Sequence, residues 1–373
     1  AVTTMSTGAI DLGEKPSVIS AIAKYHLTEK MRSSVIDAMD IHGGKGVCMG
    51  PSNYLARSYQ GAPIAITVEG ANILTRSLIV FGQGAIRCHP YLLKEIKATE
   101  NGDLKTLDNT LFAHIGFVFS NFSRSVWFGL SNAVFETSGT PMTRKYYRRL
   151  TRLSAGFALL TDYALLTLGG SLKRRERLSG RFADILANLY LCSAVLKHFE
   201  DQGEPHADQP LLDYSCQSLI HDAQQAMLAV FYNLPMPWAG KLLRFFMFPF
   251  GKPYSPPADK LIHTLAQLGM KPGETRNRLS KGIYITGDST DRTGRIEHAF
   301  QLAHQSKAAA TRLKRLSKDG RLSKNDEESR INEALKKELI SAKEAQLLKD
   351  ARIAMLNAIR VNAFQPDTLD NNH

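Results

Sequence analysis

Apolar residues recur along most of this chain at intervals of three and four positions, the spacing of one face of an α-helix. The pattern is strongest over 16–42, 182–196 and 212–230. Alternation with a period of two is almost absent, so the fold class is predicted to be all-α with few strands. The predicted core positions are Val18, Ile22, Tyr25, Met31, Val35 and Met39; Phe182, Ile185, Leu186, Leu189 and Leu196; and Leu212, Leu219, Ala223, Met227 and Val230.

Glycine and proline predict where these helices begin and end. Pro16 suits the first turn of a helix, and that helix is expected to stop at the glycine cluster 43–46. A loop with Gly61 and Pro63 follows, and a second helix is predicted from about Gly70 to Arg87. Its core candidates are Leu74, Leu78, Ile79 and Phe81. Further on, a proline-rich break is predicted over 235–257 and charged, exposed helices over 306–356.

Composition narrows the class of protein. The chain has 373 residues, a formal net charge of +12 and four separated cysteines without a CxxC pair. The charge indicates an anionic partner, such as a phosphate-rich ligand, an acidic lipid surface or nucleic acid. The cysteines predict neither a disulfide framework nor a zinc site, and the histidines lack ligand spacing, so no metal is expected. No apolar run of about 18 residues is present, so no membrane span is predicted.

Candidate chemistry gathers in two short motifs. The first is Asp40-Ile-His-Gly-Gly-Lys-Gly46, at the end of the first predicted helix, and the second is Glu69-Gly-Ala-Asn72, followed by Arg76. Each alone has a plainer explanation, because a glycine cluster commonly ends a helix and a glutamate commonly starts one. Their order and spacing give them more weight together.

Together the motifs resemble the C-terminal helical domain of acyl-CoA dehydrogenases. In that family a long helix ends in a Gly-Gly-x-Gly turn, a loop carries an arginine, here Arg57, and a Glu-Gly-x-Asn motif follows. The resemblance covers roughly residues 1–90, and 90–370 resemble the extra helical region of the long bacterial enzymes. It implies an up-and-down helical bundle over 1–95, an additional helical domain over 96–360 and a frayed tail over 361–373.

The resemblance also implies a reaction, the α,β-dehydrogenation of fatty acyl-CoA to trans-2-enoyl-CoA. Glu69 would abstract the α proton, a role that suits a carboxylate of raised pKa, while FAD accepts the β hydride. Glu69 and Gly70 would contact the substrate, since donors must meet the charge that develops on the thioester oxygen. The implied FAD contacts are Asp40, Gly43, Gly44, Gly46 and Asn72.

Two residues and the length of one interval depart from the family pattern. Asp40 stands where a glutamine usually reaches the flavin nucleotide, and a carboxylate there would repel a pyrophosphate. Ala71 replaces the usual threonine, and the interval from Arg57 to Glu69 is slightly longer than usual. These departures weaken the prediction of the cofactor contacts more than the prediction that Glu69 is the base.

Partners and location follow from the same resemblance. It implies a homodimer, an electron-transfer flavoprotein as electron acceptor, and a place in the bacterial cytoplasm, free or peripheral at the inner membrane. Because the chain begins at Ala1 and lacks the family's N-terminal and middle β domains, we expect it to be a piece of a longer protein. Alone, this piece is expected to bind FAD weakly or not at all and to be inactive.

An alternative function is a non-catalytic, basic helical module that binds membranes or lipids. Residues 237–252 combine one tryptophan, four phenylalanines and a methionine with Lys241, Arg244 and Lys252, a mixture that suits a membrane interface. The plainer interpretation is a loop whose aromatic side chains enter the core. The basic run Lys173–Arg177 could meet phosphates but is more often a solvated face. Nucleic-acid binding has the charge but no recognisable motif, and no nucleic acid is expected.

Overall fold

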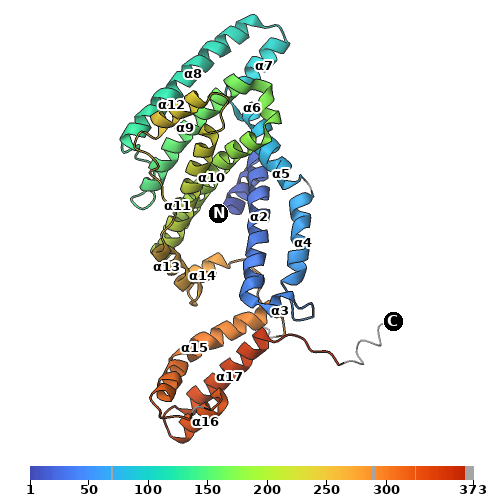
Figure 1. Ribbon diagram of the computed structural model, residues 1–373, viewed down its shortest axis with the longest axis vertical. Helices are drawn as coiled ribbons and strands as arrows, with labels where there is room; N and C mark the ends of the chain where they lie inside the picture. Colours follow the sequence, from blue (N-terminus) through green and yellow to red (C-terminus); the bar gives the residue numbers. More distant parts are fainter. Residues whose placement is uncertain (69, 287–289, 324, 366–373) are drawn as a thin grey trace, which may run out of the picture. The chain divides into compact units, whose positions relative to one another are not determined.

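The computed structural model describes residues 1–68, 70–286, 290–323 and 325–365, apart from the side chain of residue 87. In these residues every regular element is a helix, so the predicted all-α class is confirmed (Figure 1). The chain forms two compact units, unit 1 with residues 1–29 and 65–265 and unit 2 with residues 30–64 and 266–373. These units group the chain differently from the boundary predicted near residue 95, which stays a prediction.

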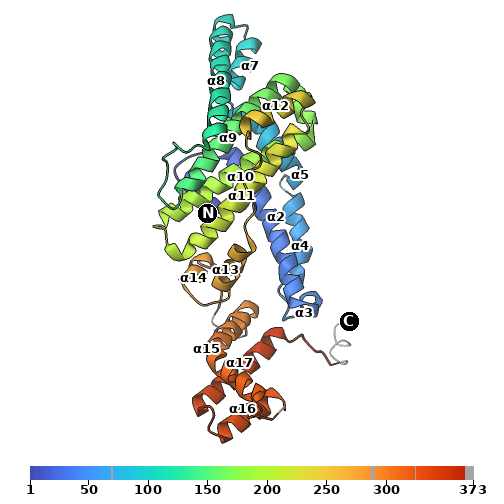
Figure 2. The same cartoon turned by 60° about the vertical axis from the view of Figure 1, so that its left-hand side comes forward.

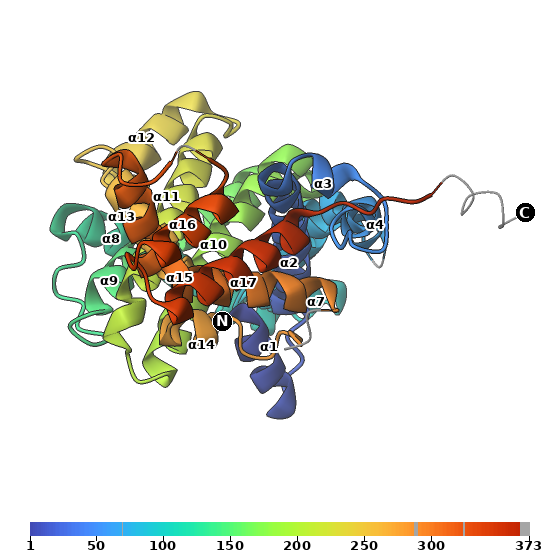
Figure 3. The same cartoon turned by 90° about the horizontal axis from the view of Figure 1, so that it is seen from below.

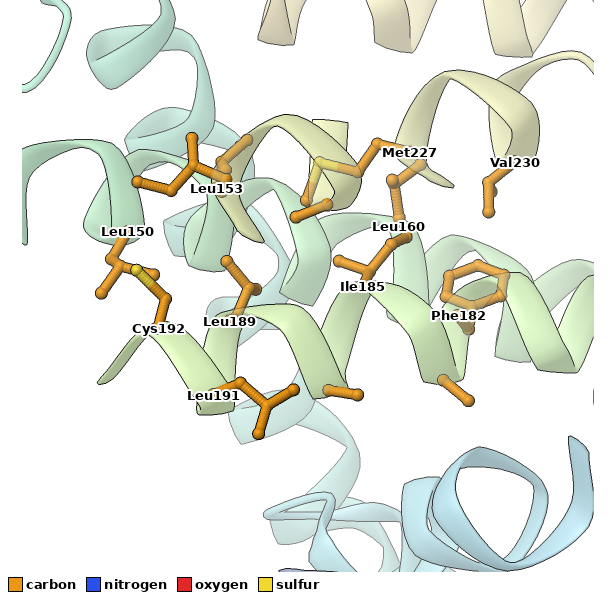
Figure 4. Close-up of a cluster of buried hydrophobic side chains, with 14 of the residues drawn as sticks. Leu150, Leu153, Leu160, Phe182, Ile185, Leu189, Leu191, Cys192, Met227 and Val230 are labelled. Carbon is orange, nitrogen blue, oxygen red and sulfur yellow. The ribbon is translucent and has the colours of Figure 1, made fainter. Parts of the chain in front are cut away.

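Unit 1 is built around three long helices, α9 (Arg144–Leu168), α10 (Glu176–Asp201) and α11 (Gln209–Phe231). Helices α10 and α11 lie side by side, and the predicted stripes on both supply the core, including Phe182, Ile185, Met227 and Val230 (Figure 4). Leu160 of α9 completes this layer and is fully buried. Both predicted stripes are therefore confirmed, with Leu186 and Leu219 only partly buried at their edges.

The remaining elements of unit 1 pack around this core. A wide π-helical segment, η1, lies on α10, and α7 forms a hairpin with α8 (Figure 2). The bounds are α1 (Val2–Asp11), α5 (Asn72–Leu74), η1 (Thr75–Gln83), α6 (Gly84–Cys88), α7 (Leu92–Glu100), α8 (Leu104–Ser131), η2 (Gly169–Arg174), η3 (His206–Asp208) and α12 (Pro237–Met247).

Unit 2 has a small core of its own. Helices α15 and α17 lie side by side with α16 against them (Figure 3), and Leu313, Ile331 and Leu348 are buried between them. The charged stretch 306–356 therefore forms a folded bundle with exposed charged faces. The bounds are α3 (Gly44–Val47), α14 (Glu274–Leu279), α15 (Arg292–Lys318), α16 (Glu327–Lys336) and α17 (Ala342–Ile359), and three helices contribute to both units, α2 (Ser17–His42), α4 (Ala56–Thr67) and α13 (Asp259–Gly269).

Two local predictions were wrong, and a third was confirmed with a different helical winding. The loop predicted after residue 47 contains α4, which carries Gly61 and Pro63 within the helix, so flanking helix formers outweigh both breakers. The break predicted over 235–257 contains α12, which Pro237 starts at its first turn, where a missing N–H costs nothing. The helix predicted from Gly70 to Arg87 is confirmed as helical structure over 72–88, in three consecutive segments, and its central one, η1, has the wider π-helical winding.

The predicted core stripe on α2 is only partly confirmed. Ile22 is buried, whereas Met31 is 41% exposed and Val35 and Met39 are only partly covered. Helical spacing identifies a possible buried face, but burial requires a partner that covers it. In the described part of this chain, that face has such a cover only near the beginning of α2.

One helical segment has the length and apolar composition of a membrane span, although the sequence predicts no span. By length and composition, the helical segment Arg144–Arg174 could cross a membrane. Half of the 18-residue apolar window within it is buried inside the protein. Because Leu153 and Leu160 lie in the core of unit 1, core packing accounts for the apolar character of this helix.

Candidate functional site

The Glu-Gly-Ala-Asn motif lies in unit 1, between α4 and η1. Glu69, the predicted catalytic base, lies outside the described residues. Gly70 has a φ of +94°, a conformation that side-chain-bearing residues rarely adopt, so glycine is needed there for backbone reasons. Its carbonyl oxygen accepts a hydrogen bond from Thr75 Oγ1 at 3.1 Å, which closes the turn into η1.

A polar network ties this motif to α2. Lys24 Nζ donates to the carbonyl oxygen of Gly70 at 2.6 Å and to Asn72 Oδ1 at 2.7 Å. Asn72 Nδ2 donates to Thr28 Oγ1 at 2.9 Å and to Glu29 Oε1 at 2.8 Å. Asn72 is 3% exposed, and both of its amide hydrogens and its oxygen are used within the protein. In this structure its side chain anchors the motif, and its predicted contact with FAD stays a prediction.

The glycine turn lies in unit 2 and also depends on an asparagine. Gly43 ends α2 with a φ of +57°, and a Cβ at Gly46 would lie 2.9 Å from the backbone oxygen of Met39. Buried Asn53 donates from Nδ2 to the carbonyl oxygens of residues 45, 46 and 48, and its Oδ1 accepts from the backbone N–H groups of residues 55 and 56. One side chain therefore holds the turn and begins α4.

The C-terminal part of unit 2 secures the same turn. Lys45 donates to the carbonyl oxygen of Ala358, and Asn362 Oδ1 accepts from the backbone N–H of Ser52 at 2.8 Å. Arg292 Nη1 donates to the carbonyl oxygen of Asn53 at 3.0 Å. Burial, and then the charge of Arg295, lower the pKa of Lys45. Lys45 of the Gly-Gly-Lys-Gly sequence thus fixes the turn to the end of α17.

The predicted cofactor residues around this turn present mixed chemistry. Gly43 and Gly44 have no heavy atom within 4 Å of an added Cβ, so their backbone is open to approach by a ligand. Asp40 and Arg57 are exposed. Asp40, Gly43, Gly44 and Gly46 belong to unit 2, whereas Gly70 and Asn72 belong to unit 1. The site predictions for all of them stay predictions.

The segment after the motif is fixed to α10. Arg76 Nε donates to Asp184 Oδ1 at 2.6 Å, and the second contact of the pair makes it bidentate; this hydrogen bonding raises the pKa of Arg76. Phe81 stacks on Phe182 with ring centroids 4.5 Å apart and planes 8° apart. Arg76, which the sequence associated with the motif, therefore serves to dock η1.

The aromatic segment 237–252 divides between core and surface. Met247 and Phe248 are buried, whereas Trp238 is 64%, Phe245 64% and Phe250 72% exposed. The buried residue Arg152 fixes the segment, because its Nη2 donates to the carbonyl oxygen of Met247 at 2.9 Å and its guanidinium lies 5.4 Å from the Phe248 ring. The aromatic side chains of this segment are therefore neither all buried in the core nor all exposed.

Other candidates have simple roles. His42 bonds to the carbonyl oxygen of Ala38 and to the Tyr54 hydroxyl, each at 2.9 Å, which is a packing role. The basic run Lys173–Arg177 is exposed, as a solvated face would be. All four cysteines are free.

Several polar residues that organise these regions were missed from the sequence. Lys24, Asn53 and Arg152 occur in no recognisable motif, and their partners lie 46, 7 and 95 positions away for the contacts with Gly70, Gly46 and Met247. Only Lys24 gave a signal, because it is a polar residue within the apolar stretch 21–25. Sequence inspection also missed a cluster of His89, His114 and Asp162, whose ligand atoms lie within 4.8 Å of one another.

Comparison with known proteins covers nearly the whole chain. A family model described as acyl-CoA dehydrogenase, C-terminal, bacterial type, matches residues 86–364. A second, described as acyl-CoA dehydrogenase, C-terminal domain, matches residues 1–82. No solved structure gives a significant match.

Proposed function

Because this chain belongs to the acyl-CoA dehydrogenase family, we propose that it is the C-terminal portion of an FAD-dependent enzyme that converts fatty acyl-CoA to trans-2-enoyl-CoA. Membership makes it an oxidoreductase of that family, whose function is of the fatty acyl-CoA dehydrogenase kind. The family is generally flavin-dependent, and its substrates are acyl-CoA thioesters. The specific reaction and the roles of residues are proposed here.

In this proposal Glu69 removes the α proton of the thioester. The observation that supports it best is the anchoring of residues 70–72 to α2 through Lys24 and Asn72. A general base works only when it is held within hydrogen-bond reach of the proton it removes, so a catalytic motif needs rigid neighbours. Gly70 would let the backbone approach the substrate closely, as its positive φ and missing side chain allow.

The fit of the chain to FAD is mixed at the glycine turn and indirect at Asn72. The open backbone at Gly43 and Gly44 suits a bound nucleotide, and these residues with Gly46 would hold part of the cofactor. Asp40 would have to turn away from the pyrophosphate, and Asn72 would act by positioning the motif. When bound, FAD would supply the hydride acceptor that no protein side chain can provide.

Partners are proposed on the same basis. We propose a homodimer that passes its electrons to an electron-transfer flavoprotein. We also propose that residues 1–373 alone hold flavin weakly and do not turn over, because the exposed carboxylate of Asp40 beside the glycine turn would repel the flavin pyrophosphate. Purified residues 1–373 with stoichiometric flavin would contradict this last proposal.

The test compares the wild type with Glu69→Gln in the full gene product that carries this chain, loaded with FAD. A saturated long-chain acyl-CoA is added without oxygen, and flavin absorbance is followed. We expect bleaching in the wild type and none in a variant that still holds its flavin. The matched control is Glu100→Gln, an exposed glutamate of α7, which should bleach like the wild type. Equal bleaching of wild type and Glu69→Gln would exclude Glu69 as the base.

A second candidate function is peripheral binding to the inner membrane, facing the bacterial cytoplasm. The exposed side chains of Trp238, Phe245 and Phe250, together with exposed Lys241 and Lys252, favour it. We expect Phe245→Ser/Phe250→Ser to reduce co-sedimentation with vesicles of phosphatidylglycerol and phosphatidylethanolamine. Phe364→Ser, at a residue 56% exposed in unit 2, is the control. Unchanged co-sedimentation of the double variant would exclude this surface.

A further inference from the structure

A buried polar cluster in unit 1 joins the α7–α8 hairpin to α9. His89, which follows α6, donates from Nε2 to Asp162 Oδ1 of α9 at 2.9 Å. His114 of α8 bonds through Nδ1 to Glu95 Oε1 of α7 at 2.8 Å, and its Nε2 lies 3.9 Å from Asp162 Oδ1. The side chains of His89 and Asp162 are only 5% and 4% exposed.

Hydrogen bonding fixes the protonation of His89. Its Nδ1 accepts the backbone N–H groups of Leu92 at 3.1 Å and Tyr91 at 3.3 Å, at the start of α7. A backbone N–H only donates, so Nδ1 carries a lone pair and the single ring proton lies on Nε2. His89 therefore acts as a neutral cap of α7 and cannot carry a positive charge while it does so.

The two hydrogen bonds to His89 Nδ1 also oppose a metal ion at this cluster. Three ligand atoms lie within 4.8 Å of one another, which is a suitable spacing. A neutral histidine that binds a metal through Nε2 needs its proton on Nδ1, where it donates to an acceptor. At His89, Nδ1 instead faces two donors. A metal would have to break the cap of α7.

The two carboxylates of the cluster have few partners inside the protein. Among the described side chains, the ion-pair partners of the carboxylates of Glu95 and Asp162 are the two histidines. Asp162 Oδ2 also accepts a hydrogen bond from Asn121 Nδ2 at 3.3 Å, so the described side-chain partners of the two carboxylates are two imidazoles and one amide, without a lysine or arginine. A buried carboxylate is costly unless it is paired, and a cation from outside the chain could pair with these two where they line the cavity.

An apolar cavity opens beside the cluster. It has a volume of about 420 Å³ and is walled by α7, α8, α9 and α12, with side chains such as Leu111, Ile115 and Leu159. Its polar lining includes Glu95, His114 and Asp162. Tyr163 also lines it, and its hydroxyl is buried without a hydrogen-bond partner among the described residues. An apolar space with a few convergent polar groups is the usual form of a small-molecule site.

We propose that this cavity binds a single-chain cationic amphiphile, with a protonated amine at Glu95 and Asp162 and an alkyl chain along the apolar walls. The volume of about 420 Å³ lies within the range of small-molecule sites, roughly 300–1,000 Å³, which accommodates one alkyl chain with its head group. The proposal does not depend on the proposed dehydrogenase reaction, because none of these residues belongs to the flavin motifs.

Calorimetry on the purified chain with dodecylamine, dodecanol and dodecanoate, each below its micelle concentration, tests the proposal. We expect the amine to bind at least tenfold more tightly than the alcohol, and the carboxylate to bind most weakly. Equal affinities for amine and carboxylate, or no binding of the amine, would overturn it. Metal analysis is the second arm, and a stoichiometric divalent ion that is lost in His114→Ala would also overturn it.

Two variants locate the ligand. Glu95→Gln, which can still accept from His114, should lose about tenfold in amine affinity and leave alcohol binding unchanged. Glu100→Gln, an exposed residue of the same helix, should change neither. Ile115→Trp fills the cavity from a position 45% exposed, where a larger side chain can be accommodated, and should abolish both. Unchanged amine binding in folded Glu95→Gln and Ile115→Trp would place the ligand elsewhere and refute the proposal.

Discussion

Replacing Asn72 with alanine would remove the centre of the network that anchors the Glu-Gly-Ala-Asn motif. The lost hydrogen bonds are a neutral one with Thr28 and charge-assisted ones with Glu29 and Lys24. A neutral bond contributes about 1 kcal/mol and a charged one about 1.5–3 kcal/mol. Lys24 keeps its bond to the Gly70 carbonyl and Glu29 can gain water, so the net loss of unfolding free energy should be about 2–4 kcal/mol.

The chain carries a convenient probe for this measurement. Its two tryptophans, Trp127 and Trp238, both lie in unit 1, so urea unfolding followed by tryptophan fluorescence reports on the unit that contains Asn72. With an m-value of about 3 kcal/mol/M, a loss of 3 kcal/mol lowers the midpoint by about 1 M. Asn109→Ala, on the exposed face of α8, should stay within about 0.5 kcal/mol of the wild type. If Asn72→Ala lowered the free energy of unfolding by less than about 0.5 kcal/mol, the stabilising role of the network would be refuted.

Three further outcomes follow from packing and charge. Phe182→Ala, at a fully buried ring of the core, should cost about 3–5 kcal/mol in the same urea assay. Gly240→Ala should cost about 1–3 kcal/mol, seen as a lower melting temperature, because the new Cβ would lie 2.1 Å from a backbone carbonyl oxygen of α11. Hydrogen bonds from Lys337 and Ser323 lower the pKa of Glu333 to about 2. The stabilisation from this carboxylate should therefore be present above its unfolded-state pKa and be lost as the pH falls through about 2, and an NMR titration that gave an ordinary glutamate pKa would contradict this.

The fold was predictable wherever a periodic stripe met a partner with a complementary stripe. The stripes over 182–196 and 212–230 became the α10–α11 layer, because each supplies the apolar face that the other covers. The stripe on α2 was equally regular, yet Met31 stays exposed. Periodicity identifies the apolar face of a single helix, whereas burial of that face also requires a second helix that covers it. Pro63 and Pro237 misled for the opposite reason, since a proline limits local geometry without forbidding a helix around it.

The site was predictable as a set of motifs and much less as a set of contacts. Motif spacing identified Gly43 and Gly70, whose positive φ values only glycine adopts easily. It could not identify Lys24 or Asn53, because a polar side chain that bonds to backbone carbonyls leaves no pattern in the sequence. It also could not show that the Asn72 amide bonds to α2 within the protein, and the predicted contact of Asn72 with FAD stays a prediction. Hydrogen-bond partners distant in the chain are determined by packing.

The π-helical winding of η1 has a consequence for insertions and deletions. A π-helix is rare in proteins. It corresponds to an α-helix with an extra residue inserted, and it persists where the displaced side chains make favourable contacts. Removing one residue from Thr75–Gln83 would relieve the winding and rotate everything beyond it by about 100°. Phe81 would then leave Phe182, and the bidentate contact of Arg76 with Asp184 would no longer share a face with it. In this segment chain length is therefore under tighter constraint than residue identity.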